Sequence, residues 1–240
     1  MSDAAQHIVK SYEQELHRLR GLMTQMGGMV ESQLALATEA IVDGDGAAAT
    51  RAVEQDPAVD ALERDVETFV IRMLALRQPM ASDLREIVSA LKITGDLERI
   101  GDYAANIAKR SIVLSGFRLP FSLAALANMS RLVQENLKLV IDAIGEADAE
   151  KALQAWRSDL AIDDLYTAIF RELITYMMED PRSITPCTHL LFIAKNLERI
   201  GDHATNVAET VHYAVTGEVL AEARPKGDAS PAYAALRGRE

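Results

Sequence analysis

Apolar residues recur every three or four positions over long stretches of the chain, with polar and charged residues between them. This spacing is typical of amphipathic α-helices, and the turn-forming Gly and Pro residues gather mainly in short segments between these stretches. The pattern predicts six long helices, at about 7–42, 47–77, just after 79 to about 115, 123–144, 147–179 and 184–215. Pro57 predicts a distortion or an early turn in the second of them.

An internal repeat organises these helices into two halves. The segment LERIGDYAANIA, which starts at Leu97, recurs as LERIGDHATNVA from Leu197, 100 positions later. Further upstream the offset is 103, and it places four apolar residues of the first predicted helix on four of the fourth: Met26, Val30, Leu34 and Ile41 on Met129, Val133, Leu137 and Ile144. We predict two homologous repeats, residues 1–117 and 118–217, and a disordered tail at 218–240.

The fold class follows from the helices and from the composition. Amphipathic helices of this length hide their apolar faces only by packing together, so each half is predicted to close as an antiparallel three-helix bundle in an all-α protein. Hydrophobic residues make up 49% of the chain and aromatic residues 5%, which suits helix packing better than a β-sandwich. Gly27 and Gly28 lie inside the first helix, where each costs about 1 kcal/mol relative to alanine, and a close helix crossing or a kink would explain them.

Charge and cysteine content narrow the function classes. The net charge of -11 argues against nucleic-acid binding, which depends on basic side chains, and leaves room for cations or basic protein surfaces as partners. The single cysteine, Cys187, excludes an intrachain disulfide and fits a reducing compartment. The chain shows neither a signal peptide nor about 18 consecutive apolar residues, so we expect a cytoplasmic protein without direct membrane insertion.

Carboxylates recur at i, i+4 spacing in both halves. The pairs are Asp56/Asp60 and Glu98/Asp102 in the first half, and Asp159/Asp163 and Glu198/Asp202 in the second. If the two pairs of one half line up, four carboxylates converge with no lysine between them, and such oxygen ligands suit Mg²⁺, Ca²⁺, Mn²⁺ or ferric iron. The alternative is a solvated outer face on which Arg99 and Arg199 form local ion pairs.

Other candidate chemistry is sparse. Glu209-x-x-His212 has the spacing of di-iron bundles, but the first half lacks its counterpart. Cys187 has no histidine at a motif spacing, and a buried, idle thiol is expected. The sequence carries no phosphate-binding glycine loop and no nucleophile elbow. We therefore predict no catalytic residues.

Five segments resemble the PhoU family of phosphate-transport accessory regulators. They are MGGMVESQL (26–34), RQPMASDLR (77–85), the doubled LERIGD and TYMMEDPRSI (175–184), and the resemblance extends over nearly the whole chain except the tail. It implies two tandem three-helix bundles with surface metal clusters on E/D-x-x-x-D motifs. The positions of this sequence that match those motifs are Glu98, Asp102, Glu198 and Asp202. The resemblance implies that carboxylates on the neighbouring helices complete the metal sites, namely Asp56, Asp60, Asp159 and Asp163. The metal, whether iron, zinc, manganese, magnesium or calcium, stays open.

The resemblance also implies a function that the residues alone do not show. A PhoU-like protein is a non-enzymatic negative regulator of the phosphate-starvation response. It links the ATPase subunit of the phosphate ABC transporter to a phosphate-sensing histidine kinase, and it is commonly a homodimer. A carboxylate-bridged metalloenzyme and a metal-storage bundle are the alternatives.

Overall fold

The computed structural model describes residues 3–77, 79, 81–117, 119 and 122–220. Within these ranges the chain forms α1 (Asp3–Val42), α2 (Gly46–Arg77), α3 (Ala81–Leu114), α4 (Ala124–Glu146), α5 (Ala149–Glu179) and α6 (Ile184–Thr216), with a short 3₁₀ turn at Pro181–Ser183. The all-α prediction is confirmed, and the helix ends lie close to the predicted bounds. Most of the predicted tail falls outside the described residues.

Two aspartates that occupy equivalent positions of the repeat start α2 and α5. The Asp45 side chain accepts hydrogen bonds from the amides of Ala47 and Ala48, at 2.8 and 3.2 Å. The Asp148 side chain does the same for Glu150 and Lys151, at 2.9 and 3.1 Å. Such caps satisfy backbone donors that have no partner within the helix, so the second helix of each half begins in the same way.

Pro57 does not end α2. The helix continues unbroken from Gly46 to Arg77 with Pro57 on its exposed side, so the predicted early turn is wrong. The proline removes one backbone hydrogen bond, but the buried residues on either side of it, Ala52 and Val59, hold both parts of the helix against the core.

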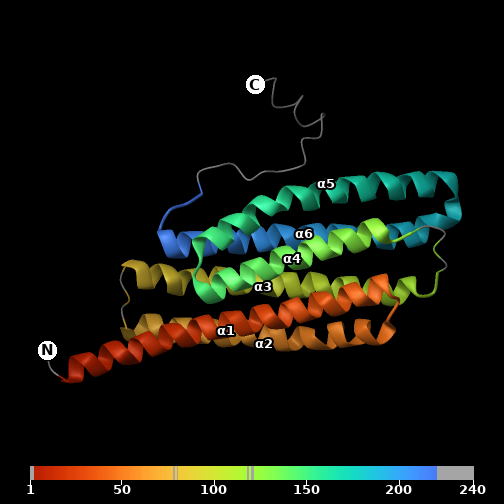
Figure 1. Cartoon of the computed structure of the whole chain (residues 1–240). Coiled ribbons are helices and arrows are strands. Elements are labelled where there is room, and N and C mark those ends of the chain that lie inside the picture. The colour runs from red at the N-terminus through yellow and green to blue at the C-terminus, as the bar shows by residue number, and fades with distance from the viewer. Residues whose placement is uncertain (1–2, 78, 80, 118, 120–121, 221–240) are drawn as a thin grey trace, which may run out of the picture.

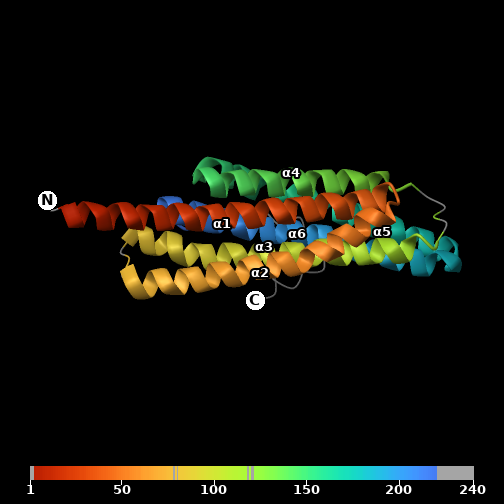
Figure 2. The same cartoon turned by 90° about the horizontal axis from the view of Figure 1, so that it is seen from below.

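The helices form two antiparallel three-helix bundles, α1–α3 and α4–α6, that lie alongside each other (Figures 1 and 2). The most extensive helix contact joins α3 to α6, and α1 packs on α4, so each of these helices meets its own repeat counterpart. Among the described residues, the outer helices α2 and α5 contact only the helices of their own bundle. We call this joint between the halves, formed by α1, α3, α4 and α6, the seam.

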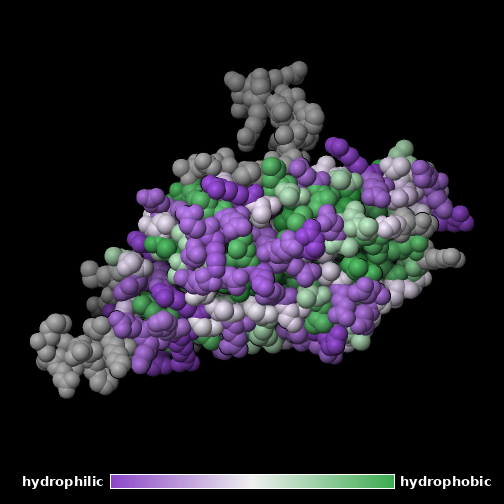
Figure 3. Space-filling view, in the orientation of Figure 1, coloured by the Kyte–Doolittle hydropathy of each residue, from purple (hydrophilic) through white to green (hydrophobic). Residues whose placement is uncertain are grey.

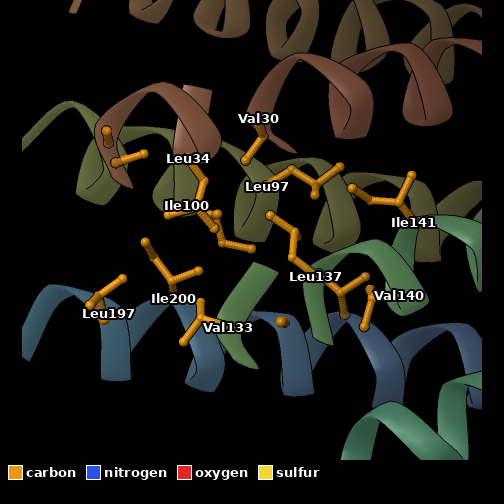
Figure 4. Close-up of a cluster of buried hydrophobic side chains, with 14 of the residues drawn as sticks. Val30, Leu34, Leu97, Ile100, Val133, Leu137, Val140, Ile141, Leu197 and Ile200 are labelled. Atoms are coloured by element: carbon orange, nitrogen blue, oxygen red, sulfur yellow. The ribbon is translucent and has the colours of Figure 1, made fainter. Parts of the chain in front are cut away.

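One core runs across the seam. Val30 and Leu34 of α1, Leu97 and Ile100 of α3, and residues of α4 and α6 including Leu137 and Ile200 point toward one another in Figure 4. The four repeat-matched apolar pairs predicted from the 103-residue offset are all buried. At the α1–α4 contact a Cβ atom on Gly27 would lie 2.9 Å from Cγ1 of Ile141, which confirms the predicted close crossing. Polar contacts also cross the seam, including His203 Nδ1 to Asp96 Oδ1 at 2.7 Å.

Candidate functional site

The acidic pairs of the first half face each other between α2 and α3. Val59 and Val66 of α2 and Leu97 and Ile100 of α3 point into the core, which leaves the carboxylates half-buried beside the contact between the two helices. A fifth carboxylate, not predicted, joins them. The first acidic cluster consists of Asp56, Asp60, Glu63, Glu98 and Asp102.

Burial and mutual repulsion perturb these carboxyl groups. Burial raises the pKa of Asp102, and the charges of Asp56 and Asp60 raise it further. Burial also raises the pKa of Glu98, together with the charges of Asp102 and Glu63. The pKa of Glu63 is raised by burial and by the nearby carboxylates Glu67 and Asp60. The cluster is thus a concentration of negative charge that a cation would stabilise.

Positive side chains oppose only part of this rise in pKa: Arg64 and Arg99 act on Glu63, and Arg99 and Lys109 act on Asp102. In the described part of the chain the cluster's only ion pair joins Arg99 Nε to Glu98 Oε2 at 3.7 Å, and the Arg99 side chain is 61% exposed. Asp56 accepts a hydrogen bond of 3.2 Å from Nε2 of Gln33, a fully buried amide on α1. An exposed pair of this length contributes little, so the cluster keeps an excess of negative charge.

The second acidic cluster, Asp159, Asp163, Glu198 and Asp202, lies at the equivalent place between α5 and α6 but differs in its surroundings. Burial raises the pKa of Glu198, and the charges of Asp202 and Asp163 contribute to this rise. Asp159 is only 1% exposed, so it sits deeper than a surface metal ligand. Lys195 Nζ contacts both Glu198 oxygens, at 2.7 and 2.6 Å. The expectation that no lysine lies among the carboxylates is therefore wrong in this half.

The donor sets of the two clusters fit a metal ion to different degrees. Across the described residues, no three Asp, Glu, His or Cys side chains are arranged closely enough to hold a metal ion as they stand. The first cluster offers only carboxylate oxygens, the ligands of hard cations, on half-buried side chains at the protein surface. The second cluster already contains an ammonium group. Metal binding at either cluster remains a prediction.

The remaining candidates have structural explanations. Glu209 Oε1 accepts a 2.8 Å hydrogen bond from Nε1 of Trp156. Glu209 therefore satisfies the indole N–H of a buried core side chain. His212 Nδ1 lies 3.2 Å from the backbone oxygen of Glu218, so it contacts the segment that follows α6. Cys187 is fully buried, and burial raises the pKa of its thiol, which makes it a poor nucleophile.

Two residues of the clusters escaped the prediction, although the sequence holds a signal for each. Glu63 lies three positions after Asp60, on the same face of α2. Lys195 lies three positions before Glu198, where the first repeat has Gly95. A residue-by-residue comparison of the two repeats would have found this difference.

The fold and the two clusters together define a class: duplicated three-helix bundles with acidic clusters between the second and third helix of each repeat. The family model described as "PhoU domain" matches residues 23–111 and again residues 126–211. The chain is 50% identical to a Caulobacter vibrioides protein over 93% of this chain and 97% of that protein. It is 47% identical to a Rhizobium meliloti protein over 92% and 94%. Both relatives carry the name "Phosphate-specific transport system accessory protein PhoU homolog".

Solved structures agree with this assignment. The crystal structure of PhoU from Pseudomonas aeruginosa superposes with a TM-score of 0.84 at 40% identity and covers 86% of this chain and all of that one. The structure of the phosphate transport system regulatory protein PhoU from Streptococcus pneumoniae gives 0.81 at 32% identity over 88% of this chain. The chain belongs to the PhoU family.

Proposed function

We propose that this protein is a cytoplasmic accessory regulator of phosphate uptake that represses phosphate-starvation signalling without catalysing a reaction. In this proposal it is an adaptor, commonly a homodimer, between the ATPase subunit of the phosphate ABC transporter and a phosphate-sensing histidine kinase. The observation that carries the proposal is the match to phosphate-specific transport accessory proteins at 50% identity over 93% of the chain.

The surface supports an adaptor role. The last turn of α3 exposes Ile112 and Val113, and α6 begins with the exposed Ile184 at the same end of the molecule. Figure 3 shows apolar surface at this end of the molecule among largely polar surroundings. Exposed apolar side chains that gather in one place favour protein–protein contact over a solvated face. No helix among the described residues is apolar and long enough to cross a membrane.

The regulatory proposal is tested by deleting the gene and measuring a phosphate-starvation reporter in phosphate-rich medium. We expect constitutive reporter expression, and we expect a plasmid copy of the gene to restore repression. A reporter that stays repressed in the deletion strain would remove the proposed regulatory function. Capture of the tagged protein from cell extract should also recover the kinase and the transporter ATPase, whereas a metal-storage protein would recover neither.

We further propose that the first acidic cluster binds a divalent cation that biases the adaptor between partner contacts. Asp56, Asp60, Glu63, Glu98 and Asp102 would hold the ion through carboxylate oxygens, and its charge would relieve their mutual repulsion. A switch of this kind requires the cation to bind one state of the adaptor more tightly than the other. Combined Glu98→Gln and Asp102→Asn should abolish tight binding without loss of helicity. The exposed Glu135→Gln on α4 is the matched control, and unchanged metal content in the double variant would refute the assignment.

A metalloenzyme is the competing function. The acid of its best motif, Glu209, is engaged by Trp156, which counts against a di-iron centre. Turnover of a phosphoester, or oxygen consumption, by the metal-loaded protein that is lost in Glu98→Gln would favour the enzyme.

A further inference from the structure

A pocket of about 330 Å³ opens at one end of the seam, and no residue of either acidic cluster lines it. Its wall includes Met23 of α1, Ile93 of α3, Ile144 of α4 and Val211 of α6. A pocket of this size, with an apolar wall and a few polar groups, is typical of a small-molecule site. The polar groups therefore determine which ligand it accepts.

Three charged side chains line this pocket, and two of them neutralise each other. Arg20 donates to both carboxylate oxygens of Glu86, from Nε at 2.5 Å and from Nη2 at 2.7 Å. The third, Asp83, lies in the first turn of α3 and has no ion pair among the described residues. The pocket thus keeps one negative charge for a ligand.

The neighbouring side chains do not remove this charge. The guanidinium of Arg85 packs against the end of α6, where a Cβ on Gly217 would lie 3.1 Å from its Cζ. Burial raises the pKa of Tyr12 to about 12, and the charges of Asp83 and Glu86 contribute to this rise. The Tyr12 phenol is therefore neutral near neutral pH, and the carboxylate of Asp83 has no counter-charge in its surroundings.

A second polar group lies further along α3 in the same pocket. Ser89 follows Asp83 by six positions, a rise of about 9 Å along the helix, and it is only 3% exposed. Its Oγ makes no hydrogen bond with any described residue, whereas the hydroxyl of Thr94 donates to the backbone oxygen of Ala90 at 3.0 Å. A buried hydroxyl without a partner gains a hydrogen bond when a ligand supplies one.

The polar residues of this pocket are not a property of the repeated fold. The 103-residue offset pairs Arg20 with Leu123, and the 100-residue offset pairs Asp83 with Ser183. The matched positions of the second repeat therefore lack both charges, so the charged wall belongs to this end of the seam.

We propose that this pocket binds an organic cation whose ammonium or guanidinium group pairs with Asp83 and whose short apolar body lies against the wall formed by α1, α4 and α6. A hydrogen-bonding group at the far end of the ligand would meet Ser89. The same chemistry can come from a free amine or from a lysine or arginine side chain of a partner protein. Because no residue of the acidic clusters lines the pocket, the proposal is independent of metal binding at those clusters.

Calorimetric titration of the full-length protein with three probes of one shape tests the sign of the charge. Tyramine is the cation, 2-(4-hydroxyphenyl)ethanol is its neutral counterpart, and 4-hydroxyphenylacetate is the anion. Tyramine should bind at least about tenfold more tightly than the neutral probe, because a charge-assisted hydrogen bond to Asp83 is stronger than a neutral one. Tighter binding of the anion would overturn the proposal, since Arg20 would then be the anchor.

Three variants test the residues. Asp83→Asn should remove the preference for tyramine over the neutral probe, and Asp65→Asn, the same change at an exposed position of α2, is the matched control. Ser89→Ala should weaken tyramine but not 2-phenylethylamine, which lacks the phenol. Ala214→Leu should abolish binding of all the probes by filling the pocket, and the first repeat has Leu114 at the matched position.

Far-UV circular dichroism and the thermal midpoint without ligand check that each variant folds. Nα-acetyl-lysinamide distinguishes the two sources: if it competes with tyramine, a partner's side chain fits the pocket, and if only tyramine binds, the ligand is a free amine. Binding of neither probe would overturn the proposal. Unchanged tyramine affinity in Asp83→Asn or in Ala214→Leu would also overturn it, because the probe would then bind elsewhere.

Discussion

The adjacent glycines of α1 offer a test of the seam, because their surroundings differ. A Cβ on Gly28 would meet no atom within 4 Å, whereas a Cβ on Gly27 would lie 2.9 Å from Cγ1 and 3.1 Å from Cγ2 of Ile141 on α4. Alanine in a helix interior is favoured over glycine by about 1 kcal/mol, and this gain applies to both positions. At Gly28 nothing opposes it, so Gly28→Ala should stabilise the protein by about 0.5–1 kcal/mol.

At Gly27 the clash of a new Cβ atom with Ile141 opposes the stability gained from the higher helix propensity of alanine. The contacting atoms belong to a buried, β-branched side chain whose χ1 is stiff, so Ile141 cannot turn away easily. Overpacking of this kind costs about 1–3 kcal/mol, which exceeds the gain from helix propensity. We expect Gly27→Ala to destabilise the protein by about 1 kcal/mol net. The two variants should then differ by about 2 kcal/mol, or roughly 4–8 °C in thermal midpoint for a chain of this size.

Thermal and urea unfolding, followed by far-UV circular dichroism, measure both variants. Ile141→Ala removes the atoms that Gly27→Ala would meet, at a cost of about 2–5 kcal/mol. In that background Gly27→Ala should become stabilising, which gives a coupling energy between the two positions. Equal shifts of the same sign for Gly27→Ala and Gly28→Ala would refute the α1–α4 crossing and with it the shared core.

Three further predictions concern the acidic cluster, the tryptophan and the thiol. Glu98→Gln with Asp102→Asn should raise the free energy of unfolding near neutral pH in chelator-containing buffer, because the folded state raises both pKa values above their ordinary 4.5 and 3.8. This difference in the free energy of unfolding should shrink as the pH falls through the raised pKa values toward 4.5 and 3.8, because the wild-type carboxylates take up protons there. Urea unfolding from about pH 4 to about pH 8 measures the change. Glu209→Ala leaves the buried Trp156 N–H without an acceptor and should cost about 1–3 kcal/mol, with a change in tryptophan fluorescence that Glu209→Gln largely avoids. Cys187 should react with a thiol reagent only upon unfolding, because the folded chain buries it fully; fast labelling of the native protein would contradict this placement.

The helices and their ends could be predicted because their signals are local. Apolar periodicity, the turn after Val42 and the glycine at 217 each act within a few residues of the helix end that they determine. Pro57 misled for the same reason. Its local effect favours a break, whereas the contacts of Ala52 and Val59 with the core, which span the bundle, hold the helix together.

The seam could not be predicted from the pattern. The apolar residues of the first predicted helix look the same whether they face their own bundle or the other one. Val30 and Leu34 contribute to a core that also includes Val133 and Leu137 of α4, more than 90 positions away in the chain. Periodicity identifies a buried face but not its partner.

The acidic clusters lie between these two cases. The i, i+4 spacing fixed which carboxylates share a helix face, but the convergence of α2 with α3 depends on how each helix is rotated about its axis. The packing of Val59 and Val66 sets that rotation for α2. Glu63 lies three and not four positions from Asp60, and Lys195 occupies a position where the repeats differ, so neither belongs to the repeated i, i+4 pattern.

The seam has a consequence for how such a chain could have arisen. Because α1 meets α4 and α3 meets α6, a gene for one repeat would encode a chain that leaves its α1 and α3 faces bare until it finds a second copy of itself. Fusion of two copies replaces that encounter with an intramolecular one, at an effective concentration in the millimolar range for a short connection. Fusion also allows the two repeats to differ in sequence, because two copies of a chain encoded by one gene must carry the same residue at each position. Only after fusion could one copy keep a glycine at position 95 while the other acquired a lysine at 195.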